Sequence, residues 1–194
     1  DHVWGVNNWD DTYYRQGQDG KFKKLGGKIS RLSVSCDGSQ VYGVNSSDRV
    51  YYRKNINSNE GTSWEKLPGT HKALKRVSIS CQAHHMWGVS PNEYVYYREK
   101  GDSSWRKMSG RMRQISVSCD GTKVWGINPY DDVYFRAGKN GSWKKISGDL
   151  KRVSVSCDGT QVWGVNSWDQ IFSRNMEEEK WIELPGRFKE ITVA

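Results

Sequence analysis

Short runs of β-branched and aromatic residues recur along the chain and alternate with clusters of turn-forming residues. Within residues 29–67, four such runs are 31–36, 41–45, 49–53 and 64–67. The first two are joined through Asp37-Gly38, a dipeptide that tolerates positive φ and is typical of hairpin turns. β-Branched and aromatic side chains suit a pleated, half-buried surface. The pattern therefore predicts four short antiparallel strands in this segment.

One five-residue motif fills the second run of every unit. Its copies are Val3-Trp4-Gly5-Val6-Asn7, Val41-Tyr42-Gly43-Val44-Asn45, Met86-Trp87-Gly88-Val89-Ser90, Val124-Trp125-Gly126-Ile127-Asn128 and Val162-Trp163-Gly164-Val165-Asn166. They lie 38, 45, 38 and 38 residues apart. Such a period indicates a module that buries its apolar face only by stacking on copies of itself. Four strands per module match a propeller blade, so the sequence predicts an all-β, five-bladed β-propeller.

The repeats leave no linker, and we expect one domain over residues 1–194. Its approximate units are 191–194 with 1–28, 29–72, 73–110, 111–148 and 149–186. Ile191–Ala194 aligns with Val153–Ser156, a first strand, or one step further on with the Ser-Cys end of that strand, whereas the chain begins with a second strand. Pairing of Ile191–Ala194 with Val3–Asn7 is therefore expected to complete the fifth blade and close the ring.

The ten Trp and ten Tyr, against six Leu and four Ala, favour strands over helical repeats. Gly43 and its equivalents interrupt the second strands, and a strand glycine usually marks a close approach by another group. We expect a tryptophan of the neighbouring blade there. Most of the repeated aromatic residues are thus predicted to pack between blades.

The four cysteines, Cys36, Cys81, Cys119 and Cys157, occupy one equivalent position in four units, and Ala194 occupies it in the fifth. Ligands related by symmetry around a ring are expected to lie too far apart for a tetrahedral metal site, and the CxxC spacing of zinc modules is absent. Disulfides between blades need Cα atoms within about 7 Å, which only positions near the axis provide. We expect free, buried thiols, with inter-blade disulfides as the alternative.

The net charge is +8, and twenty of the thirty Lys and Arg lie in the predicted fourth strands and the connections after them. A cation ring suits an anionic surface such as lipopolysaccharide, acidic glycans or phospholipid headgroups. The alternative is solvated charge that protects outer strands from edge-to-edge association. No single basic groove with interleaved aromatics is visible, which disfavours nucleic acid. His84-His85 replace part of a hairpin turn and are interpreted as a degenerate turn rather than a metal site.

The turn between the second and third strands varies most in chemistry, and repeat proteins tend to place function on such loops. Three of the five turns carry an aromatic residue, and an acidic residue follows it in each of them. The candidate binding residues are Asn8, Trp9, Asp10, Tyr130, Asp131, Trp168 and Asp169. A ring stacks on the C–H face of a sugar while carboxylates and amides bond its hydroxyls. The alternative is that the acids simply close the turns.

Catalysis has little support in the sequence. The recurrent acids form no unique pair that could flank a glycosidic bond. The cysteines are repeated and the histidines are clustered, so no nucleophile and base set is indicated. We therefore expect a protein that is not an enzyme.

The repeats resemble the tectonin repeat over all 194 residues. Their shared pattern is V-W-G-V-N-x-x-D-x-V/I-Y-x-R, followed by W-x-K-L/I-x-G and then by R-V-S-V-S. The chain is similar to the fish-egg lectin family and to tachylectin-1-like β-propeller lectins, whose members typically have six repeats. The resemblance implies binding of N-acetylglucosamine-type (GlcNAc) glycans or lipopolysaccharide in crevices between blades, and a role in innate defence. It also implies that calcium can occupy the central tunnel, although the sequence identifies no ligands for it.

The sequence thus favours a multivalent lectin for microbial or cell surfaces. The alternatives are a protein-interaction scaffold and a charge-driven binder of anionic surfaces. No apolar run is long enough to span a membrane. The start at Asp1 is typical of a mature or trimmed product. Sequons at Asn45 and Asn140 favour an extracellular location, whereas the absence of a disulfide framework favours an intracellular one.

Overall fold

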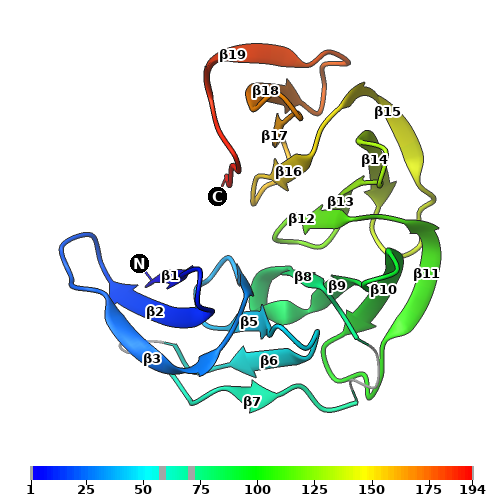
Figure 1. Cartoon of the computed structure of the whole chain (residues 1–194). Helices are drawn as coiled ribbons and strands as arrows, with labels where there is room; N and C mark the ends of the chain where they lie inside the picture. Colours follow the sequence, from blue (N-terminus) through cyan, green and yellow to red (C-terminus); the bar gives the residue numbers. More distant parts are fainter. Residues whose placement is uncertain (1, 57–59, 70–72, 194) are drawn as a thin grey trace.

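The computed structural model describes residues 2–56, 60–69 and 73–193. Its strands form five antiparallel sheets arranged around a common axis (Figure 1). The first sheet has three strands, β1 (His2–Val6), β2 (Asp11–Gln16) and β3 (Lys23–Lys28). This arrangement is the predicted five-bladed β-propeller.

The other four blades have four strands each. Along the chain these strands are β4 (Arg31–Val34), β5 (Val41–Val44), β6 (Val50–Arg53), β7 (Glu65–Lys66), β8 (Arg76–Ile79), β9 (His85–Val89), β10 (Tyr94–Glu99), β11 (Arg106–Arg111), β12 (Gln114–Val117), β13 (Lys123–Ile127), β14 (Asp132–Ala137), β15 (Lys144–Asp149), β16 (Arg152–Val155), β17 (Gln161–Val165), β18 (Gln170–Asn175) and β19 (Ile182–Arg187). Blades 2 to 5 are β4–β7, β8–β11, β12–β15 and β16–β19. Within the described residues no helix is long and apolar enough to cross a membrane.

The core is divided among the junctions between blades. Four apolar clusters join blades 1 and 2, 2 and 3, 3 and 4, and 4 and 5. Trp87 and Trp125 are the largest fully buried side chains, and they make edge-on contacts with Trp143 and Trp181 of the following blades. The predicted packing of repeated aromatics between blades is confirmed.

The position of the neighbouring tryptophan differs from the expectation. The glycine of the second strand is approached by the segment that leads into its own blade: a Cβ at Gly126 would lie 2.9 Å from Met112 Sδ. The neighbour's ring lies instead on a glycine of the outer strand. A Cβ at Gly148, whose φ is +112°, would lie 2.9 Å from Cδ1 of Trp181. The Trp181 indole also donates a 2.7 Å hydrogen bond to the Ser147 carbonyl.

Innermost strands are linked from blade to blade by serine hydroxyls. The amide of Val117 donates to Ser78 Oγ at 3.2 Å, and that of Val155 donates to Ser116 Oγ at 3.1 Å. The amide of Val193 donates to Ser154 Oγ at 3.1 Å. The C-terminal segment therefore takes the register predicted for it, with Val193 equivalent to Val155.

The predicted closing pair is wrong for the described residues. β1 pairs with β2 alone, residues 188–193 form no strand, and Ala194 lies outside the described residues. β1 and the segment after β19 lie apart in Figure 1, so that an open sector separates blades 1 and 5. The C-terminal segment is held by blade 5 through Ser154, whereas β1 contacts β4 of blade 2.

Candidate functional site

The turns between second and third strands share one backbone design. In the fourth blade the Asn128 side-chain oxygen accepts from the amides of Tyr130 and Asp132, each at 2.9 Å. Asp131 has φ of +70°, and its carbonyl accepts from the amide of Leu150 at 2.8 Å, on the way into the next blade. Asp10, Asp48, Glu93 and Asp169 have the same positive φ and the same type of carbonyl bond. The acids therefore close the turns through their backbone.

The side chains of these turn acids have different partners from blade to blade. The Asp131 carboxylate forms an ion pair of 2.5 Å with Arg113 and accepts a 2.6 Å hydrogen bond from the hydroxyl of Ser167. Asp169 pairs with Lys151 and Lys189, and these bonds lower its pKa. Asp10 has no side-chain partner within the described residues. Asp131 and Asp169 thus combine turn closure with charge pairing.

The three predicted aromatic residues are the most exposed large apolar side chains of the described chain. The exposed fractions are 74% for Trp9, 83% for Tyr130 and 72% for Trp168. The Asn-x-x-acid frame holds the backbone on both sides of each ring, so each ring stands on a fixed turn. Fixed, solvent-exposed rings are suited to stacking on a ligand.

The structure brings two of these turns together. The bond from Ser167 to Asp131 joins the turn of Trp168 to the turn of Tyr130, on adjacent blades 5 and 4. Asn8, Trp9 and Asp10 lie on blade 1, across the open sector, and within the described residues no hydrogen bond or ion pair connects them to blade 5. The candidate site is therefore strongest at the junction of blades 4 and 5.

A crevice of about 470 Å³ lies between blades 2 and 3. Its lining includes the stacked rings of Tyr42 and Tyr52, 5.7 Å apart, with Lys54, Asn55 and Arg98. Burial, followed by the Tyr52 hydroxyl, raises the pKa of Tyr42 to about 12, so its hydroxyl stays protonated. The Arg98 guanidinium donates a 2.5 Å bond to the Pro68 carbonyl. This crevice combines ring faces with hydrogen-bond donors.

The sequence analysis did not single out that crevice, although two signals mark it. Tyr42 stands where the other units have tryptophan, and the second unit is seven residues longer than the others, since 45 exceeds 38 by 7.

A central channel of about 710 Å³ follows the axis and is lined by the innermost strands. Arg31, Arg76, Gln114 and Glu190 lie around one mouth. Arg76 pairs with Val89 just before a second-to-third strand turn, which places this mouth on the face that carries Trp9, Tyr130 and Trp168. Burial, then the charges of Arg31 and Arg152, lower the pKa of Arg76 to about 10.

The lining of this mouth does not fit a calcium ion. Calcium takes six to eight oxygen ligands, mostly carboxylates and carbonyls. Among the described residues Glu190 is the one carboxylate lining the channel, and it lies with Arg31 and Arg76, whose charges oppose a dication. The same charges suit an anion.

Many exposed lysines are paired with acids at the outer edge of their blades. Asp11, at the start of β2, pairs with Lys24 at 2.7 Å and Lys28 at 2.6 Å. These hydrogen bonds lower its pKa to about 2. Lys145 pairs with Asp132 in the same manner at 2.5 Å. Part of the positive charge that recurs in each blade is therefore used in ion pairs at the blade edges.

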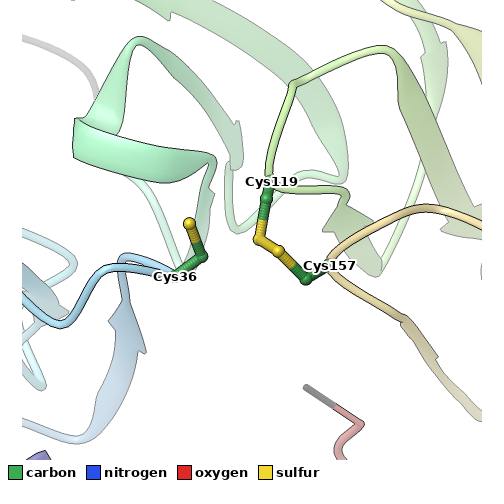
Figure 2. Close-up of side chains that lie close together, drawn as sticks. All are labelled: Cys36, Cys119 and Cys157. Atoms are coloured by element: carbon green, nitrogen blue, oxygen red, sulfur yellow. A yellow bond between two sulfur atoms is a disulfide. The ribbon is translucent and has the colours of Figure 1, made fainter.

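The expectation of free thiols is wrong, because Cys36 is bonded to Cys81 and Cys119 to Cys157. Figure 2 shows the second bond with Cys36 beside it. The paired Cα atoms lie 4.9 Å and 4.6 Å apart. The cysteines follow directly after the innermost strands, where neighbouring blades are closest to one another. The four equivalent cysteine positions were also expected to lie too far apart for a shared metal ion, and this expectation is wrong so close to the axis.

The histidine pair behaves as a turn element. A short 3-10 turn over Cys81–Ala83 replaces the Asp-Gly hairpin, and His85 begins β9. The His85 ring bonds the Tyr97 hydroxyl at 2.6 Å, and burial lowers its pKa. The interpretation as a degenerate turn is confirmed.

Comparison with known proteins agrees with this architecture. The family model described as the tectonin domain matches residues 1–83 and 54–194. The chain belongs to the tectonin family. Among solved structures, the β-propeller domain of Cps50 (Swd1) from Myceliophteria thermophila has a TM-score of 0.72 and 10% identity, covering 99% of the tectonin chain and 73% of its own. That likeness concerns the fold alone. No curated protein matches the tectonin chain.

Proposed function

We propose that this tectonin propeller is a non-enzymatic lectin that binds GlcNAc-type glycans or lipopolysaccharide through several weak sites. The exposed trio of Trp9, Tyr130 and Trp168 carries this proposal. An exposed ring on a rigid turn offers a flat apolar face on which a ligand can stack. Membership of the tectonin family supports binding of some ligand.

The site at the junction of blades 4 and 5 offers both parts of sugar recognition. Tyr130 and Trp168 supply ring faces, and Asp131, bonded to Ser167, supplies an acceptor between them. Repeated weak sites on one rigid body gain avidity on a dense glycan surface. A glycan array, with free N-acetylglucosamine as competitor, tests the proposal directly. Failure to bind any glycan overturns it.

The crevice between blades 2 and 3 is an alternative location for the same function. Tyr42 and Arg98 of its lining are buried, whereas the turn aromatics are exposed. Tyr52→Ala and Trp168→Ala, compared for binding of one glycan, separate the two locations. Loss of binding in the first variant alone assigns the sugar to the crevice.

A second function, charge-driven binding of an anionic surface, is favoured by the channel mouth. Arg31 and Arg76 line it and have no hydrogen-bond or ion-pair partner within the described residues. Salt separates the two functions. Raised ionic strength weakens the attraction of an anionic surface to these charges, whereas stacking of a sugar on a ring persists.

Action outside the cell, in innate defence, belongs to the same proposal. Its support is the sequon at Asn140, an exposed residue in the turn after β14. Asn45 is a poorer site for glycan attachment, because its side-chain oxygen accepts hydrogen bonds from the backbone amides of Ser47 and Arg49. A glycan found on Asn140 of the native protein supports secretion, and its absence from protein isolated from its source counts against it.

A further inference from the structure

The cysteines gather at the end of the channel opposite the arginine mouth. The Sγ atoms of Cys36, Cys119 and Cys157 all lie within 4.8 Å of one another, as Figure 2 shows. The sulfur of Cys81 is bonded to that of Cys36. Four thiolates around a tetrahedral zinc ion, with Zn–S of about 2.3 Å, are about 3.8 Å apart. The spacing of the three grouped sulfurs is compatible with this requirement, and Cys81, which is outside that group, would join them from its place beside Cys36.

Backbone bonds hold the cysteines in place in addition to the disulfides. The amide of Cys81 donates to the Cys119 carbonyl, and that of Cys119 donates to the Cys157 carbonyl, both at 2.9 Å. Serine hydroxyls one layer deeper link the same strands. Reduction of the disulfides therefore leaves the sulfur atoms near the axis.

The charges of the surrounding turns favour a cation. Asp37, Asp120 and Asp158 directly follow three of the cysteines. The hydroxyl of Ser156 donates to the carboxylate of Asp158 at 2.5 Å, and the hydroxyls of Ser35 and Ser118 donate to Asp37 and Asp120 at 2.6 Å each. These bonds hold three acidic side chains in the turns that surround the cysteines.

We propose that, once reduced, the four cysteines form a site for one thiophilic metal ion, and that this ion is zinc. A thiol or phosphine reductant supplies two electrons to each disulfide, and two protons complete the two resulting thiols. Binding of Zn²⁺ then releases the thiol protons to solvent, since the thiolate is the ligand. Thiolate ligands select zinc over hard cations such as magnesium. Oxidation restores the two disulfides and removes the site.

The test uses the full chain in its oxidised and reduced forms. After anaerobic reduction and removal of the reductant, four thiols are counted, and Co²⁺ or Zn²⁺ is titrated. We expect one ion per chain, a sulfur-to-cobalt charge-transfer band that zinc abolishes, and a higher unfolding temperature with zinc. The oxidised protein is the matched control and should bind neither ion.

Variants separate a four-cysteine site from general thiol binding. Cys119→Ser and Cys36→Ser should each weaken zinc binding about a hundredfold or more, since even loss of a supporting outer-shell group costs up to about that factor. Asp158→Asn, which keeps all ligands, should bind one ion. The proposal is overturned when the reduced, folded protein with four free thiols shows no charge-transfer band. It is also overturned when reduction unfolds the chain and zinc does not restore the fold.

Discussion

The Ser167 hydroxyl of one blade donates a 2.6 Å hydrogen bond to the Asp131 carboxylate of the preceding blade. This bond fixes the turn of Trp168 relative to that of Tyr130. Ser167→Ala should weaken glycan binding, because two exposed rings then lose their common support, while the free energy of unfolding changes by less than about 0.5 kcal/mol. Glycan titration and urea unfolding measure the two effects. Ser46→Ala, at the equivalent position of blade 2, is the control and should leave binding unchanged.

Trp168→Ala and Trp9→Ala should each lower glycan affinity about fivefold, since a stacking ring contributes on the order of 1 kcal/mol. Both rings are mostly exposed, so stability should barely change. The measurement is glycan titration of each variant beside the parent protein. Unfolding of both variants, or normal glycan binding by both, would show that these turns are structural.

Removal of a repeat tryptophan should have the opposite effect. Trp125 is 1% exposed and packs on Trp181 and Phe135, so Trp125→Ala should destabilise the fold by about 3–5 kcal/mol through the cavity it leaves. Trp163, on the last blade, is only half-buried, because no following blade covers it in the structure. Trp163→Ala should therefore cost less. If urea unfolding shows the same loss of unfolding free energy for Trp125→Ala and Trp163→Ala, the ring is closed in solution.

Acid should weaken blade 1 through Asp11. Its folded-state pKa, about 2, lies below the ordinary value of 3.8 because of Lys24 and Lys28. A lowered pKa means that the ionised form is preferred in the folded state, so its stabilisation is present above pH 3.8 and is lost as the pH falls toward 2. Asp11→Asn should remove this part of the pH dependence in acid unfolding curves. An unchanged curve in the variant would contradict the assignment.

The sequence by itself determined the repeat, the strands and the residues at the turns. The Val-Trp-Gly-Val-Asn motif and the Asp-Gly dipeptides are local signals, because strand propensity and positive φ belong to single residues and their neighbours. The exposure of Trp9, Tyr130 and Trp168 followed from the same reasoning, since a turn between polar residues projects its side chains into solvent.

The tertiary structure alone decided how the blades meet. Distances between equivalent positions depend on their radius from the axis, which no spacing along the chain reveals. The cysteines are close to one another because they follow the innermost strands. The crevice beside Tyr42 depends on the fit of two blades. The separation of the C-terminal segment from β1 depends on how the blades pack around the axis. These quantities arise from side chains far apart in sequence, so the repeat pattern predicted the blades but not the geometry of the ring.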